Sequence, residues 1–124
     1  MSKVLTSITT GSQVFTSTTL CGIVYFMSEA YRHIVLFGIK HEVDESTRAE
    51  AVSLLRELGH NAVGLREWTV TESIDTRKGH VIVENGLFES PDAFEEFRSS
   101  DSHVEAGAFM RDIADWLVAD YLED

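Results

Sequence analysis

The chain of 124 residues has the length of one ordinary domain, which excludes a two-domain enzyme with a separate cofactor domain. Hydrophobic residues make up 44% and charged residues 25%, a composition typical of a folded globular domain rather than a disordered chain. The net charge of −11 repels nucleic-acid phosphates and anionic lipid, so we expect neither nucleic-acid nor membrane partners.

A single cysteine, Cys21, excludes an internal disulfide and a Cys-rich zinc site. A single cysteine fits a reducing compartment. The longest apolar run is shorter than the roughly 18 residues that would predict a membrane span. A secretory signal is disfavoured because Lys3 is the only basic residue near the start. We therefore expect a cytoplasmic protein.

The first 28 residues differ from the rest, since they hold no acidic residue and are rich in Ser and Thr. Two interpretations stay open: a flexible extension with a β-prone patch at Leu20–Phe26, or a natural start at Met27. We assign residues 1–28 to an N-terminal extension and 29–124 to the folded domain. Deletion of residues 1–26 is expected to leave the domain folded.

The strongest strand pattern in the chain is Tyr31–Ile39. Its alternating residues are apolar on both sides, which predicts a strand covered on both faces. A helix is predicted next, from about Ser46 to Leu58, with capping-box spacing at Thr47-x-x-Glu50 and Gly59 as a left-handed C-terminal residue.

Two strands are predicted to follow, Leu65–Ile74 and His80–Phe88, joined by a hairpin turn at 75–79. Asn85-Gly86 is interpreted as a bulge, because the apolar pattern resumes directly after it.

Ser90-Pro91-Asp92 predicts a helix start, with an N-cap residue, a proline in the first turn and then an acid. The chain breaks at Ser99-Ser100, and Ser102-x-x-Glu105 predicts the start of another helix. A last strand is predicted from Trp116 to Tyr121.

The predicted order β-α-β-β-α-α-β is the α+β, ferredoxin-like arrangement: a four-stranded antiparallel sheet with helices on one face. We expect the open face to be apolar and to pack against the sheet of a second copy, which predicts a homodimer. The residues assigned to that open face are His33, Val35, Phe37, Ile39, Trp68 and Val70.

Four segments, in this order, resemble the stress-responsive A/B barrel (Dabb) family of dimeric α+β barrels. They are Tyr31–Phe37, Phe88-Glu89-Ser90, Ser102-His103-Val104 and Ala119-Asp120-Tyr121. The resemblance implies two protomers that pack sheet to sheet, each with an internal cavity. Some plant members are polyketide cyclases that close an aromatic ring without a cofactor, whereas most members have no assigned activity.

The resemblance implies a catalytic base at His103, just before the last helix. The positive end of that helix favours the neutral imidazole that a base requires; the alternative is a histidine that only starts the helix. The cyclases pair this histidine with a tyrosine hydroxyl six residues earlier, where this chain has Phe97. Glu105 also replaces a glycine of the cyclases, so both departures argue against the cyclase reaction itself.

His33 and Asp120 match the histidine and aspartate that support the site in the cyclases. A carboxylate holding an imidazole is a sound arrangement for that role, and a buried structural pair is the alternative. His80 has the same strand parity as Ile82 and is a candidate to line the cavity. Phe97, Val104 and Trp68 are assigned with it as candidate ligand contacts.

No metal site and no cofactor are expected, since the chain has no H-x-x-x-H or H-E-x-x-H spacing, no G-x-G-x-x-G and no P-loop. Three functions stay open. The first is a homodimer that binds a small hydrophobic or aromatic molecule in its cavity. The others are a cofactor-free, cyclase-like enzyme with His103 as its base, and a structural or stress-protective oligomer.

Overall fold

The computed structural model of this chain describes residues 29–123. The predictions for residues 1–28, including the β-prone patch, lie outside the described residues. No helix in residues 29–123 has the length and apolar character needed to cross a membrane.

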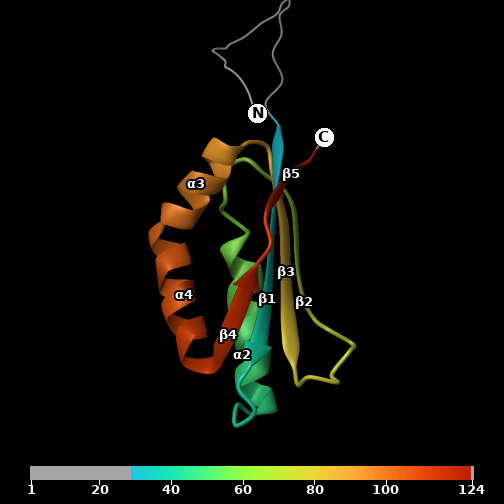
Figure 1. Cartoon of the computed structure of the whole chain (residues 1–124). Helices are drawn as coiled ribbons and strands as arrows, with labels where there is room; N and C mark the ends of the chain where they lie inside the picture. Colours follow the sequence, from blue (N-terminus) through green and yellow to red (C-terminus); the bar gives the residue numbers. More distant parts are fainter. Residues whose placement is uncertain (1–28, 124) are drawn as a thin grey trace, which may run out of the picture.

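Residues 29–123 form five strands and three helices, which follow the predicted order except that the last predicted strand is divided in two (Figure 1). The elements are β1 (Ala30–Ile39), α2 (Glu45–Leu58), β2 (Leu65–Glu72), β3 (Val81–Phe88), α3 (Pro91–Ser99), α4 (Asp101–Ile113), β4 (Ala114–Val118) and β5 (Tyr121–Glu123).

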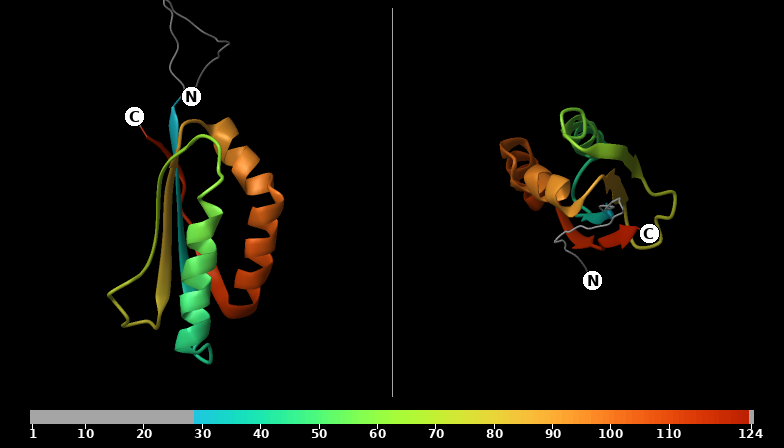
Figure 2. Two further views of the ribbon diagram at one scale, coloured as in Figure 1. Left: turned by 180° about the vertical axis from the view of Figure 1, so that it is seen from behind. Right: turned by 90° about the horizontal axis from the view of Figure 1, so that it is seen from above.

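The strands form one antiparallel sheet in the order β2-β3-β1-β4, with β5 pairing β1 beyond the end of β4. This is the strand order of the ferredoxin-like fold, so the predicted fold class is confirmed. All three helices lie on the same side of the sheet, which curves around them (Figure 2). No helix of residues 29–123 covers the opposite face of the sheet, and we call it the open face.

The break between β4 and β5 has a specific cause at Asp120. Its Oδ1 accepts a hydrogen bond from the backbone N–H of Ile34 at 3.2 Å, in the place where a paired strand would offer a carbonyl. The backbone N–H of Ala119 still donates to the carbonyl of Ile34 at 2.9 Å, so the side chain of Asp120 replaces only the backbone acceptor that would return this bond. The sheet therefore has five strands rather than the predicted four.

Two helices begin earlier than their capping-box spacings predict. Asp44 caps α2 by accepting from the N–H of Thr47 at 2.8 Å, and Ser100 caps α4 by accepting from the N–H of His103 at 3.3 Å. Each true cap stands in a run of cap-type residues, and spacing alone does not choose among them. The predicted start of α3 at Ser90-Pro91 is confirmed.

Trp68 lies between two glycines, and this explains both of them. A Cβ on Gly59 would come within 2.4 Å of the indole of Trp68, and one on Gly86 within 2.7 Å. Gly59 has φ −79°, so the prediction of a left-handed residue is wrong. The β1–β3 and β2–β3 pairings also run without a shift at Gly86; the irregularity lies between Leu65 and Glu67.

The face of β1 that carries His33, Val35, Phe37 and Ile39 packs against the helices, where all four side chains are buried. Val70 is buried on the same face, and the indole of Trp68 donates to the carbonyl of Leu55 in α2 at 3.0 Å. The prediction that these residues form the open face is therefore wrong. Alternation groups residues onto one face, but β1 is apolar on both faces and does not say which one the helices cover.

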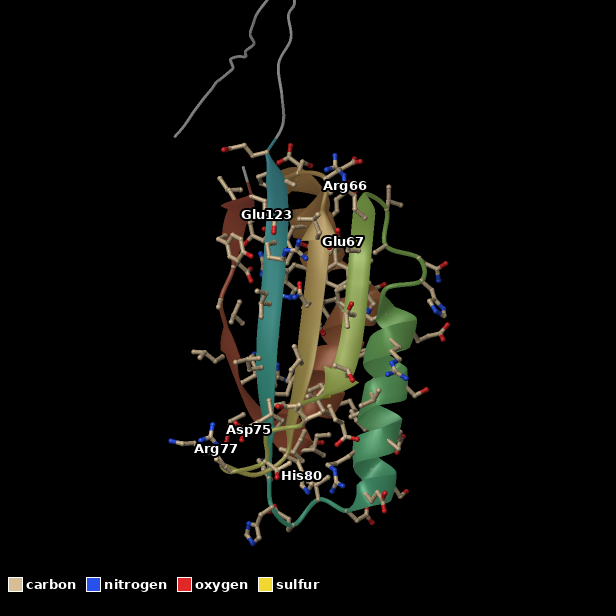
Figure 3. The ribbon with its side chains drawn as sticks, turned by 90° about the vertical axis from the view of Figure 1, so that its right-hand side faces the viewer. Arg66, Glu67, Asp75, Arg77, His80 and Glu123 are labelled. Carbon is tan, nitrogen blue, oxygen red and sulfur yellow. The ribbon has the colours of Figure 1, made fainter. Side chains whose placement is uncertain are left out.

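The open face has a group of charged residues at one end, and an apolar strip (Figure 3). In the charged group, Arg32 donates to Glu123 on β5 at 2.8 Å and to Glu67 on β2 at 3.1 Å. The apolar strip runs across β1, β3 and β4, where Leu36 pairs with both Val83 and Leu117. Its members are Ile34, Leu36, Val81, Val83 and Leu117.

Candidate functional site

A cavity of about 430 Å³ lies between the sheet and the helices. Along β1, the residues that face it change from Tyr31 and His33 to Val35 and Phe37, so its polar groups gather at the end where β1 begins. The polar lining is Tyr31, His33, Glu84, His103 and Asp120, with Glu95 and Arg98 on the exposed rim. The apolar lining is Val35, Phe37, Leu55, Leu58, Met110, Trp116 and Val118.

His33 stands between two carboxylates at the polar end. Its Nδ1 lies 2.9 Å from Oδ1 of Asp120, and its Nε2 lies 3.1 Å from Oε2 of Glu84. The contact with Asp120 is a good hydrogen bond, whereas the N–H at Nε2 does not point well at Glu84 and is fully buried. His33 and Glu84 are only 5% and 2% exposed, so this is a buried ionic cluster.

Tyr31 supports the same cluster from the start of β1. Its hydroxyl donates to Oδ2 of Asp120 at 2.9 Å, and its ring stacks on Phe94 of α3 at 4.4 Å between centroids. Burial and the hydrogen bond to Asp120 raise the pKa of Tyr31 to about 12. Asp120 thus accepts from Tyr31, His33 and the backbone of Ile34, and these bonds fix its position.

His103 faces the cavity from the first turn of α4, where its backbone N–H is capped by Ser100. Its ring is partly buried against the edge of Phe97, with the centroids 5.0 Å apart. Among residues 29–123 no side chain or backbone group forms a hydrogen bond with its ring nitrogens. The ring thus lines the cavity with no hydrogen-bond partner in residues 29–123 at either nitrogen.

The pKa values of the two histidines are displaced in opposite directions. Burial opposes the charge on His33, but Glu84 and Asp120 outweigh it and raise the pKa of His33 above its ordinary value. Burial lowers the pKa of His103, and the nearby Glu84 only partly offsets this. The two imidazoles of this cavity thus lie in environments that favour opposite protonation states, the charged form for His33 and the neutral form for His103.

The model of the stress responsive A/B barrel domain matches residues 31–123. The chain belongs to this family. No curated protein matches it.

Solved structures with a similar fold include two bacterial proteins that are described as dimeric and of unknown function. The one from Thermobifida fusca is 17% identical with a TM-score of 0.71, over 81% of this chain and 96% of its own. The one from Bacteroides fragilis is 17% identical with a TM-score of 0.65, over 79% and 100%.

A plant enzyme, the hydroxynitrile lyase from Passiflora edulis, is also similar. It is 20% identical with a TM-score of 0.68, over 77% of this chain and 94% of its own. At these identities the similarity shows the fold alone.

The fold of this chain brings three of the predicted site residues, His33, Asp120 and His103, to one cavity. Phe97 does not line that cavity: it is buried among Phe88, Phe94 and Trp68, and its other side borders a second hollow between α2 and α4. Trp68 is likewise a packing residue beside Phe97.

The two remaining predicted contacts lie away from the cavity. His80 is exposed at the end of the sheet opposite Glu67 and Glu123 (Figure 3). Val104 is 61% exposed and does not line the cavity. Glu84 has the same strand parity as His80, and it lies within β3 where that strand runs beneath the helices.

Sequence reasoning missed Glu84, Tyr31 and Arg98. Glu84 follows the alternation of Ile82 on β3, and Tyr31 follows that of His33 on β1, so strand parity contains the signal for both. Arg98 reaches the rim from α3, which only the packing of α3 over the sheet reveals. In residues 29–123 no three His, Cys, Asp or Glu side chains are arranged to hold a metal ion.

Proposed function

We propose that this barrel protein acts as a homodimer that binds a small, mainly apolar molecule, such as an aromatic compound, in the sheet–helix cavity. The observation that carries the proposal is the cavity itself, apolar along most of its wall and polar at one end. Ligand sites typically have such a lining and volumes of roughly 300–1,000 Å³. The cavity's 430 Å³ falls within that range.

The composition of the polar end favours ligand binding over a purely structural role. A core that served only stability would have little use for two histidines and two carboxylates, because buried ionic groups seldom stabilise a fold better than apolar residues of the same size. The exposed rim formed by Glu95 and Arg98 gives a molecule in solution access to the cavity.

Filling part of the cavity should weaken binding without unfolding the protein. A Cβ on Gly107 of α4 meets no atom within 4 Å, and Gly107 lines the cavity, so the larger side chain of Gly107→Leu would occupy ligand space. A helix is also more stable with leucine than with glycine in its interior, by roughly 1 kcal/mol. We expect Gly107→Leu to lose at least about tenfold in affinity for any aromatic compound found by a thermal-shift screen.

Ala108→Leu is the matched control, because Ala108 is exposed on the same helix and does not line the cavity. It should leave the affinity unchanged. Equal affinity in Gly107→Leu and in the unchanged protein would contradict binding in this cavity.

A second function, proton-transfer catalysis without a cofactor, is favoured by the opposite pKa displacements of His33 and His103. His103 would be the base, since its ring nitrogens are available. Phe97 offers no hydroxyl, and the hydroxyl of Tyr31 is already donated to Asp120, so neither supplies the tyrosine of the cyclases. Any such reaction therefore differs from the cyclase reaction in its acid group.

His103→Ala should then reduce kcat by roughly 10²-fold or more, the usual contribution of a positioned base. Because the pKa of His103 is lowered, the fall of activity on the acid side should be centred below pH 6.5. A pH–rate profile of both proteins with a substrate from the same screen measures this. Full activity in His103→Ala would exclude His103 as the base.

A further inference from the structure

We infer that the cavity selects molecules carrying an amine or another hydrogen-bond donor, that it rejects carboxylates, and that Glu84 makes this choice. The inference rests on the proposed binding of a small apolar molecule in the same cavity. It concerns the polar end, where the charges of the lining groups do not balance.

Acidic groups outnumber basic ones at the polar end. Two carboxylates, Glu84 and Asp120, contact one imidazole, His33, so at most one of them is neutralised by it. On the rim, Arg98 forms an ion pair with Glu95 and leaves no cation to spare. His103 has a lowered pKa and adds no fixed positive charge. A bound carboxylate would thus meet excess negative charge in a site of low polarity.

Glu84 is the acceptor that stays open to a ligand. Both oxygens of Asp120 already accept hydrogen bonds, from Tyr31 and from His33 and Ile34. Nε2 of His33 is fully buried and out of a ligand's reach. Glu84 lines the cavity; its Oε2 lies 3.1 Å from Nε2 of His33, whereas no donor in residues 29–123 forms a hydrogen bond with its Oε1. A buried carboxylate in that condition gains most from a donor that a ligand brings.

The apolar wall of the cavity determines which chemical body a ligand needs besides its donor group. Beyond Glu84 the lining turns to Phe37, Met110 and Trp116, with the rings of Phe37 and Trp116 meeting edge to face at 5.4 Å. An aromatic body suits that wall, with a short chain that brings its donor to Glu84. The structure therefore favours an arylalkyl amine, or a neutral arylalkyl alcohol, over an arylalkyl acid.

Three probes that share the naphthyl ring and a two-carbon side chain test this: naphthylethylamine, naphthylethanol and the carboxylate naphthaleneacetate. Their dissociation constants would be measured by calorimetry at neutral pH and physiological salt. We expect the amine to bind at least about tenfold more tightly than the acid, with the alcohol between them. This comparison uses the unchanged protein and needs no variant.

Glu84→Gln removes the charge and keeps the shape, so it should reduce the preference for the amine over the acid to within about twofold. Glu105→Gln is the matched control, since it makes the same change in net charge on α4 but borders the second hollow instead of the cavity. It should keep the full preference. This control separates Glu84 from the general attraction of an acidic protein for cations.

The outcomes separate the two proposals. Binding of the acid as tightly as the amine would overturn the inference and leave the proposed binding standing. A preference that persists in folded Glu84→Gln would overturn the role of Glu84. Failure of all three probes to bind would contradict the proposed function itself, and the inference with it.

Discussion

Replacing His33 with leucine is expected to lower the free energy of unfolding by about 3–5 kcal/mol, the usual cost of removing one partner of a buried ion pair. His33 is 5% exposed and separates Glu84 from Asp120. Without the imidazole, Glu84 would be a buried carboxylate with no cationic partner. Urea unfolding at neutral pH measures the loss, and a loss below about 1 kcal/mol would show that the cluster does not hold the fold together.

The double variant His33→Leu with Glu84→Leu should recover most of that loss. Apolar residues of similar volume often replace a buried ion pair at little or no cost. Asp120 would keep its bonds from Tyr31 and from the backbone of Ile34, so it would not be left unpaired. A double variant as unstable as the single one would mean that lost packing, rather than the unpaired charge, accounts for the effect.

The cost of losing His33 should depend on pH in a known direction. Its pKa is raised in the folded protein, so the stability it contributes is fully present below pH 6.5 and is lost as pH rises through the raised value. The difference in unfolding free energy between the unchanged protein and His33→Leu should therefore be larger at pH 6 than at pH 9. His103 has a lowered pKa, and its contribution has the opposite slope.

The fold could be predicted from the sequence because the periodicity of each segment is strong. The Tyr31–Ile39 strand and the start of α3 at Ser90-Pro91 needed no tertiary information. The division between β4 and β5 could not be predicted in this way. It depends on the Asp120 side chain bonding to the backbone of Ile34, 86 residues away.

The candidate site could be predicted in part. The family resemblance paired His33 with Asp120, and the structure brings them to 2.9 Å, while their role stays a prediction. Glu84 was missed because a carboxylate among apolar residues on a strand is usually read as solvent-exposed. Its burial follows from the helices that cover that side of β3, which the sequence of β3 does not reveal.

The helices cover one face of β1, so a dimer contact through the sheet can form only on the other face. Since His33, Val35, Phe37 and Ile39 lie under the helices, an aspartate at Val35 or Phe37 would disrupt the protomer's own core and would not test association. The apolar strip on the open face is the surface to change. Leu36 is 40% exposed and Leu117 is 66% exposed there. Contiguous exposed apolar surface is the feature expected at the interface of the proposed dimer.

Leu36→Asp should therefore weaken the proposed dimer strongly while leaving each protomer folded. In a twofold dimer every substitution occurs twice in one interface, and a buried unpaired charge costs about 3 kcal/mol or more, so the dissociation constant should rise at least about 100-fold.

Ser53→Asp is the matched control, because Ser53 is exposed on α2, on the helical side. Sedimentation at micromolar concentration should give twice the mass of one chain for the unchanged protein and for Ser53→Asp, and one chain for Leu36→Asp. A monomeric unchanged protein would refute the dimer, and a dimeric Leu36→Asp would place its interface elsewhere. The apolar strip favours a dimeric unchanged protein and a monomeric Leu36→Asp, because Leu36, Val83 and Leu117 lie side by side in one register across three strands.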